Sequence, residues 1–336
     1  MIWYKEKNDD IVISTRIRLA RNIKKYPFPN AMTDAQIKSA VAEVENAVPG
    51  GNSTLAKTFK NYRMSELDEV GRGELVEKHL ISPNLGRRAS VMISDDENMS
   101  IMLMEEDHIR LQIIKGGFSL DEAWNLADKV DDVIEERIEY AFHKDFGYLT
   151  ACPTNVGTGM RASVMMHLPA LTMTNNMDRI ISSASNLGIA VRGLYGEGSK
   201  AYGALYQISN QITMGMSEEE LIEKLKNIVM QIKTHEENTR TKLKNDKNIA
   251  LEDRLWRSYG TLKYARSVTS TEAKTLISDV ILGVNLGIIK KEDANFIELM
   301  IETEPSVLSK KAGGNLKPEE RDIKRAENLR AFMSIN

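Results

Sequence analysis

The most informative stretch of the chain runs from Cys152 to Ser163 and reads CPTNVGTGMRAS. It holds the only cysteine among 336 residues, in a polar segment with two glycines rather than in an apolar run. A single cysteine cannot form a disulfide within the chain or supply a CxxC metal pair. It is either a small buried side chain or a site thiol, and composition alone favours the buried side chain.

Length and composition predict an ordinary globular protein of two domains, with 42% hydrophobic and 28% charged residues. The net charge of −3 gives no overall basic field, so we expect no nucleic-acid partner. No apolar run approaches the length of a membrane span, and the charged start MIWYKEKNDD is unlike a signal peptide. We therefore expect a cytoplasmic protein that does not enter a membrane.

Strand patterns dominate the first half of the chain. Residues 13–19 alternate between apolar and polar, the period of a half-buried strand. Residues 89–117 predict a hairpin that turns at Asp95–Asn98 and is followed by another strand. Short connections favour antiparallel pairing. Further strands are predicted within 148–153, 161–171, 188–196 and 201–209.

Capping boxes at Ser119–Glu122, Ser217–Glu220 and Thr269–Glu272 each precede apolar residues at helical spacing. The charged run 236–254 is predicted to be the outer part of a long helix. Pro318 suits the first turn of a last helix, expected to continue through Arg330.

These patterns predict an α+β fold. A largely antiparallel sheet flanked by helices should occupy residues 1–215, and a smaller helical domain should occupy residues 216–336.

Common nucleotide and metal motifs are missing from the sequence. It contains no GxxxxGK[ST] loop, and Gly157-Thr158-Gly159 is followed by Arg161 instead of a third glycine. The five histidines show no HExxH or other metal spacing, so we predict no metal ligands from the chain.

Arginine is the remaining candidate for phosphate binding, because its planar guanidinium donates paired hydrogen bonds and stays charged. Arg16 and Arg18 lie two apart on a predicted strand and so share one face. The alternative for any one of these side chains is a solvated surface arginine. The other candidates at strands or strand ends are Arg110, Arg161 and Arg192.

The chain carries five motifs that resemble, in order and spacing, the signature segments of the phosphagen kinases, the creatine and arginine kinase superfamily. They are STRIRLARN (14–22), MEEDHIR (104–110), CPTNVGTGMRASV (152–164), VRGLYGEG (191–198) and SNQITMG (209–215). Departures from the family pattern include Met104 in place of asparagine and Tyr195 in place of arginine.

The resemblance implies a phosphagen-kinase-like catalytic domain that uses ATP and Mg²⁺, with the metal held mainly by phosphates and water. Arginines would clamp the phosphates, and His79 would lie beside the nucleotide. The positions that the resemblance assigns to ATP binding are Ser14, Thr15, Arg16, Ile17, Arg18, His79, Arg110, Arg161, Ala162, Ser163, Val164, Met165, Arg192, Gly193, Leu194, Tyr195, Gly196 and Glu197.

The resemblance also implies three catalytic residues. Glu106 and Glu197 would grip the acceptor guanidinium, and Cys152 would lie against it with Thr154 hydrogen-bonded to the sulfur. A guanidinium is a poor nucleophile until a carboxylate orients it and removes a proton. Without the resemblance, the acidic run 105–107 would be interpreted as a solvated strand end.

Two features separate the chain from kinases of free creatine or arginine. Those enzymes carry a helical domain before the first arginine motif, whereas only about ten residues precede it here. An uncovered site would admit an arginine side chain of a polypeptide. In addition, RDIKRA (321–326) and EKHLISPNL (77–85) resemble the bacterial protein arginine kinases, the McsB family.

In that family RDxxRA implies an allosteric phosphoarginine site, here formed by Arg321, Asp322, Arg325 and Ala326. Arg321 and Arg325 are one helical turn apart, so their guanidinium groups could receive phosphoryl oxygens together. The alternative is a solvated helix with internal ion pairs.

We therefore expect an ATP-dependent protein arginine kinase. The resemblance further implies a homodimer, an McsA-like activator, a ClpC-type unfoldase that degrades the marked proteins, and a role in the stress response. Expected substrates are a CtsR-type repressor and misfolded proteins. One alternative is a kinase of a free guanidino metabolite, opposed by the missing N-terminal domain. Another is a non-catalytic adaptor that inhibits a repressor, opposed by the retained glutamates and cysteine.

Overall fold

A computed structural model describes residues 2–6, 9–50, 59–194, 201–246, 249–291 and 294–334. The strands are β1 (Val12–Arg21), β2 (Phe59–Arg63), β3 (Ser90–Ser94), β4 (Met99–Leu103), β5 (Ile109–Gly116), β6 (Phe142–His143), β7 (Gly147–Tyr148), β8 (Met160–His167), β9 (Ile189–Gly193) and β10 (Leu205–Asn210). The α-helices are α1 (Asp34–Gly50), α2 (Glu69–Glu77), α3 (Leu120–Glu135), α4 (Pro169–Met173), α5 (Met177–Asn186), α6 (Glu218–Asn245), α7 (Ile249–Tyr264), α8 (Ser270–Asn285), α9 (Phe296–Glu302), α10 (Pro305–Lys311) and α11 (Pro318–Ser334).

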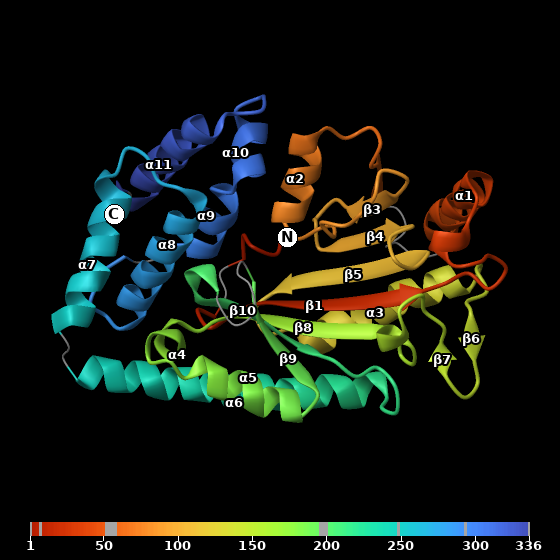
Figure 1. Ribbon diagram of the computed structural model, residues 1–336, viewed down its shortest axis with the longest axis horizontal. Coiled ribbons are helices and arrows are strands. Elements are labelled where there is room, and N and C mark those ends of the chain that lie inside the picture. The colour runs from red at the N-terminus through yellow and green to blue at the C-terminus, as the bar shows by residue number, and fades with distance from the viewer. Residues whose placement is uncertain are drawn as a thin grey trace. The chain divides into compact units, whose positions relative to one another are not determined.

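An eight-stranded sheet has the order β2-β3-β4-β5-β1-β8-β10-β9 (Figure 1). The pairs β2–β3, β3–β4, β4–β5 and β1–β5 are all antiparallel. The predicted hairpin is confirmed as β3 and β4, with β5 as the strand that follows it. The predicted α+β class is confirmed, because helices cover this sheet and form the C-terminal region (Figure 1).

The chain divides into two compact units that interleave along the sequence. Residues 1–3, 14–163 and 209–226 form the first unit, and residues 4–13, 164–208 and 227–336 form the second. The sequence predicted contiguous segments, 1–215 and 216–336. Hydrophobic patterning reports which segments are helices and strands, and long-range contacts decide how those segments group.

Two of the three capping boxes form as predicted. The Ser217 amide donates to Glu220 at 2.8 Å and the Glu220 amide donates to the Ser217 hydroxyl at 3.2 Å. The Thr269 hydroxyl likewise accepts from the Glu272 amide at 3.3 Å. At Ser119 the box is wrong, since its hydroxyl instead donates to the Gly116 carbonyl at 3.2 Å.

Some elements differ from the prediction. The long helix over 236–254 is interrupted, because α6 ends at Asn245 and α7 begins at Ile249. Sequence reasoning missed α1, although Thr33 and Gln36 form a capping box in which the Thr33 amide donates to the Gln36 side chain at 2.9 Å. The last helix begins at Pro318 as predicted and continues to Ser334.

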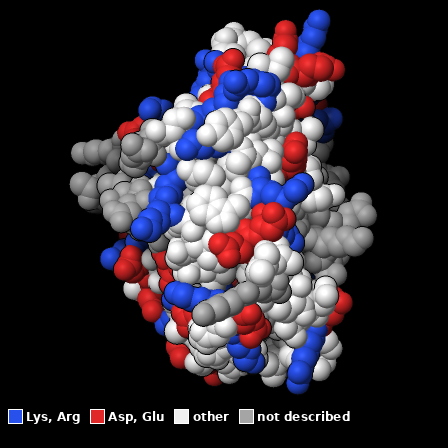
Figure 2. Space-filling view, turned by 90° about the vertical axis from the view of Figure 1, so that its left-hand side faces the viewer, with Lys and Arg blue, Asp and Glu red and all other residues white. Residues whose placement is uncertain are grey.

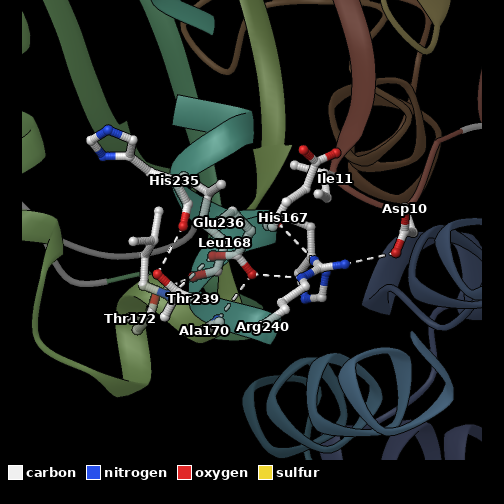
Figure 3. A network of polar contacts seen from close by, with 12 residues as sticks. Asp10, Ile11, His167, Leu168, Ala170, Thr172, His235, Glu236, Thr239 and Arg240 are labelled. Atoms are coloured by element: carbon white, nitrogen blue, oxygen red, sulfur yellow. Dashed lines mark hydrogen bonds and ion pairs between the residues drawn. The ribbon is translucent and has the colours of Figure 1, made fainter. Parts of the chain in front are cut away.

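A buried polar network organises the second unit (Figure 3). The carboxylate of Glu236 on α6 is fully buried and accepts from the Ala170 and Leu171 amides, each at 3.0 Å. Arg240 donates to Glu236 at 2.8 Å and to Asp10 at 2.7 Å. One face of the charged run therefore compensates buried charge and caps the start of α4, where amides lack helical partners.

Helix α7 leaves apolar side chains in solvent. Ile249, Trp256 and Tyr264 are 81%, 44% and 68% exposed, and their spacing puts them on one side of the helix. Figure 2 shows the side of the molecule on which α7 lies in Figure 1, with acidic and basic side chains interspersed around uncharged atoms. None of the helices in the described parts of the chain is long and apolar enough to cross a membrane.

Candidate active site

Strand β1 presents two arginines on one face of the sheet. Ile17 and Leu19 are fully buried on the opposite face, so the alternation of the strand turns Arg16 and Arg18 away from that core. Both arginines remain half-buried.

The pairing of β1 with β5 brings in a third arginine. Arg110 lies opposite Ala20 and Gln112 lies opposite Arg18 in the antiparallel register. Paired residues share a face of a sheet, so Arg110 lies on the face of Arg16 and Arg18. The strand on the other side of β1 is β8, which carries Arg161.

Three of these guanidinium groups line one cavity of about 140 Å³ together with Glu106 and Cys152. The cavity is lined by Arg18, Leu19, Ala20, Glu106, Arg110, Cys152, Thr154, Asn155, Gly159 and Arg161. The structure thus brings together residues from three of the predicted motifs.

The arginine cluster concentrates positive charge. Burial, with Arg161 and Arg110 nearby, lowers the pKa of Arg16 to about 10. The pKa of Arg18 is lowered well below its usual value by burial and by the same neighbours together with Arg16. Its Nε is buried without a hydrogen-bond partner among the described residues. These properties fit a polyanionic ligand. Its oxygens would neutralise the repulsion between the guanidinium groups and accept a hydrogen bond from Arg18 Nε.

Two carboxylates lie beside Arg110. Glu105 forms an ion pair with Arg110 Nη1, and the Glu106 carboxylate lies 3.4 Å from Nη2. The side chain of Glu106 is 43% exposed, so it can reach a ligand in the cavity.

The cysteine is held as the resemblance implied. Cys152 Sγ lies 3.0 Å from the Thr154 hydroxyl, which confirms the expected hydrogen bond to the sulfur. The thiol is half-buried, and the turn Pro153–Asn155 follows it directly. Cys152 is therefore not a core side chain, and the core interpretation suggested by composition is wrong.

Sequence reasoning missed the residue that anchors this loop. Asp107 is 1% exposed, and one carboxylate oxygen accepts from the Ala151 amide and from Asn22, each at 2.7 Å. The acidic run therefore has two functions, because Asp107 fixes the backbone next to Cys152 while Glu106 faces the cavity. An Asp that follows two glutamates carries no sequence signal of this burial.

The glycine turn approaches β1 closely. Gly159 has a φ of +63°, and a Cβ there would lie 2.7 Å from the Ala20 carbonyl oxygen. Arg21 donates to the Thr158 carbonyl at 2.9 Å and forms a buried ion pair with Asp131 at 2.8 Å. Only glycine permits this approach, which places Arg161 beside the arginines of β1.

Asn210 in the SNQITMG motif supports the same region. Its side chain accepts from the Ala162 amide at 2.8 Å and donates to the Met160 carbonyl at 3.0 Å. Several positions assigned to ATP binding are themselves buried and do not line the cavity of about 140 Å³. They are Ser14, Thr15, Ile17, Ala162, Ser163, Val164 and Met165.

His79 lies near the arginine face. Its carbonyl accepts from Gln112 at 2.8 Å, and Gln112 is opposite Arg18 in the sheet register. The ring contacts Trp3, with centroids 5.7 Å apart.

The fourth motif lies in the second unit. Arg192 is exposed on β9, and Gly193 and Leu194 follow it. Tyr195, Gly196 and Glu197 lie outside the described residues, so the prediction for the second glutamate stays a prediction.

The C-terminal motif holds one of its two arginines in a buried position. Arg325 is 1% exposed, and it donates to the carbonyls of Thr303 at 2.8 Å and Val268 at 2.9 Å. It also pairs with Asp322 at 2.5 Å. The helix is therefore not merely a solvated charged face, and the two arginines are not equally open to a ligand. Arg321 and Asp322 are half-buried, while Ala326 is buried beside them.

Within the described ranges, no group of three or more His, Cys, Asp and Glu side chains could hold a metal ion.

Comparison with known proteins identifies the class to which the chain belongs. The sequence model of the ATP:guanido phosphotransferase C-terminal catalytic domain matches residues 39–239, and that of the protein-arginine kinase McsB C-terminal domain matches residues 248–336. A lombricine kinase structure has a TM-score of 0.62 at 24% identity, covering 72% of this chain and 69% of that chain. The duplicated taurocyamine kinase of Schistosoma mansoni also scores 0.62 at 24% identity, covering 70% and 34%. The fold and the sequence therefore define an ATP:guanido phosphotransferase.

Within this class, the chain belongs to the protein-arginine kinase family. The protein-arginine kinase of Caldanaerobacter subterraneus is 48% identical over 321 residues, covering 95% of both chains. The enzyme of a Geobacillus strain is 49% identical, covering 98% of this chain and 92% of its own. The enzyme of Bacillus subtilis is 46% identical, covering 99% and 93%.

Proposed function

We propose that this protein transfers the γ-phosphoryl group of ATP to arginine side chains of proteins. The observation that carries the proposal is the cavity in which Arg18, Arg110 and Arg161 face Glu106 and Cys152. Similarity to protein-arginine kinases over nearly the whole chain supports a protein acceptor.

In the proposed reaction, the arginine cluster holds the phosphates in line with the acceptor nitrogen. Phosphoryl transfer depends mainly on positioning and charge stabilisation, which fixed guanidinium groups supply. When bound, Mg²⁺ would neutralise charge on the phosphate oxygens. A P–N bond forms, the P–O bond to ADP breaks, and the acceptor proton passes to a carboxylate. Glu106 is the proposed carboxylate, and Glu197 would be its partner.

The direct test is to incubate the protein with MgATP and either an unfolded protein or free arginine. Mass spectrometry under non-acidic conditions should find phosphoarginine on the protein, because P–N bonds are acid-labile. Turnover confined to free arginine would support a metabolite kinase instead. No transfer to either acceptor, despite binding of ATP, would favour the non-catalytic adaptor.

The proposed cellular role follows the family resemblance. Phosphoarginine would mark a CtsR-type repressor and misfolded proteins for a ClpC-type unfoldase in a cytoplasmic stress response, with an McsA-like activator. A homodimer is also proposed, and the exposed stripe on α7 is one surface that could be covered. Co-purification with each named partner, and light scattering of the chain alone, are the corresponding measurements.

The C-terminal motif is proposed to bind phosphoarginine and to regulate activity. The guanidinium of Arg325 is already bound to Thr303, Val268 and Asp322. Its proposed role is therefore to hold Asp322 and Arg321 in place for the ligand. Arg321→Ala should remove activation by added phosphoarginine, whereas Lys324→Ala on the exposed side of α11 should retain it. Equal activation of both variants would contradict this role.

A further inference from the structure

A second cavity borders the loop that carries Cys152. It has a volume of about 310 Å³, and Gly157 and Thr158 of the same loop form part of its wall. The β6–β7 hairpin supplies Phe142 and Phe146, and Met214 comes from the segment before α6. We call this cavity, lined by Phe142, Phe146, Met214 and the glycine turn, the hairpin groove.

The hairpin groove has both apolar and polar walls, and its large apolar side chains are open to solvent. Phe142, Phe146 and Met214 are 57%, 52% and 48% exposed. Three large apolar side chains gathered in one solvent-filled hollow are uncommon on a surface that contacts only water, and they mark binding sites. The hairpin itself is anchored, since Tyr148 stacks on the buried guanidinium of Arg21 at 3.5 Å.

The groove is joined to the acceptor side of the site by hydrogen bonds. The Thr213 hydroxyl contacts the carbonyl oxygens of Thr154 at 2.9 Å and of Val156 at 2.7 Å. Met214 is the next residue, so this wall of the groove and the loop that holds Cys152 are fixed to one another. A polypeptide whose arginine lies at Cys152 would place its neighbouring residues along this loop.

The charges around the groove favour a basic polypeptide. Asp145 and Glu218 line it together with the aromatic side chains. Two carboxylates suit a segment that carries arginine, and they disfavour an acidic one. The combination of apolar walls and acidic rim matches a chain with apolar residues close to its target arginine.

We propose that the hairpin groove binds apolar residues that flank the target arginine in an extended substrate polypeptide. Such residues are buried in folded proteins, so the groove would direct the enzyme to unfolded segments. This inference rests on the proposed phosphorylation of protein arginines and adds the sequence context that the site selects.

The test compares two short peptides that carry the same central arginine. Leucine and phenylalanine flank the arginine in one peptide, and serine and glycine flank it in the other. Wild-type kcat/KM should be about tenfold or more higher for the apolar-flanked peptide, since burial of two aromatic contacts supplies at least this factor. In the Phe142→Ser/Phe146→Ser variant the ratio should fall to within about twofold of one. Phe118→Ser, which alters a 38% exposed phenylalanine outside the groove, should keep the wild-type ratio.

The possible outcomes separate the groove proposal from the proposed function and from binding of a second copy of the chain. Equal kcat/KM for the two peptides with wild-type enzyme would overturn the groove proposal and leave protein arginine phosphorylation standing. Phosphorylation of neither peptide, with turnover of free arginine, would overturn the proposed function itself. A double variant that loses mass in light scattering would show that a second copy of the chain covers the groove. Should the hairpin variant fail to fold, Met214→Ser repeats the test with a lining residue from a different segment of the chain.

Discussion

Replacing Arg16 by methionine should stabilise the nucleotide-free protein while weakening its binding of ATP. Burial and the nearby Arg161 and Arg110 lower the pKa of the Arg16 guanidinium to about 10. An unperturbed arginine has a pKa above about 12, and one pKa unit corresponds to about 1.4 kcal/mol. The charged form therefore carries roughly 3 kcal/mol of unfavourable free energy in the folded chain. Because the folded pKa is the lower one, this penalty is present at every pH below about 10.

Methionine keeps most of the apolar stem and removes the charge. The guanidinium makes contacts that methionine cannot, so we expect a net gain of about 1–2 kcal/mol rather than the whole penalty. In a chain of 336 residues, that gain corresponds to a rise in Tm of about 1.5–3 °C. Saturating ATP should raise the free energy of unfolding by less than it does in the wild type. The difference should be about 1.4 kcal/mol for each tenfold loss of ATP affinity.

The assay is thermal unfolding of wild type, Arg16→Met and Arg16→Lys, each with and without MgATP. Lysine retains the positive charge but lacks the planar fork, so its Tm without nucleotide should stay near that of the wild type. ATP protection should fall in both variants. A lower nucleotide-free Tm for Arg16→Met than for Arg16→Lys, or equal ATP protection of all three proteins, would refute the reasoning.

Three other expectations concern the site and the second unit. Glu106→Ala and Cys152→Ser should each lower kcat by roughly 10²-fold with little change in ATP affinity measured by calorimetry, and near-normal turnover would end their catalytic assignment. Burial lowers the pKa of His167 to about 3 in the folded chain. In the unfolded chain this histidine binds a proton at about pH 6.5, so the free energy of unfolding falls as the pH drops below that value. Urea unfolding should show about 2 kcal/mol less stability from this group at pH 5 than at pH 7, and His167→Gln should remove that part of the pH dependence. Glu236→Ala should lower the free energy of unfolding by about 3–5 kcal/mol, because it leaves the charge of buried Arg240 partly uncompensated. Glu237→Ala, at an exposed position, should change it by less than about 0.5 kcal/mol. Similar losses in both variants would show that the buried network contributes little to stability.

Sequence reasoning reached the local features of the molecule. The alternation on β1 predicted that Arg16 and Arg18 share a face, and the Ser217 and Thr269 caps predicted two helix starts. The hydrogen bond between Cys152 and Thr154 also involves near neighbours. Such features depend on residues a few positions apart, which periodicity and capping chemistry describe directly.

Burial within polar segments was the main thing that sequence reasoning missed. Asp107, Glu236 and Arg325 each lie in a charged run that resembles a solvated surface, yet each is almost completely buried. Charge itself gives no indication of which member of a run is covered, because that depends on distant backbone groups that satisfy it. For Arg325 these groups are the carbonyls of Thr303 and Val268.

What the sequence by itself determined is the set of motifs, their order, and the residue types able to bind phosphate and hold a guanidinium. Only the tertiary structure decided that Arg110 and Arg161 meet Arg18 at one cavity with Glu106 and Cys152. The physical reason is strand register. A shift of one residue in the pairing of β1 with β5 would turn every second side chain of β5 to the opposite face, and the same sequence would then have no arginine cluster.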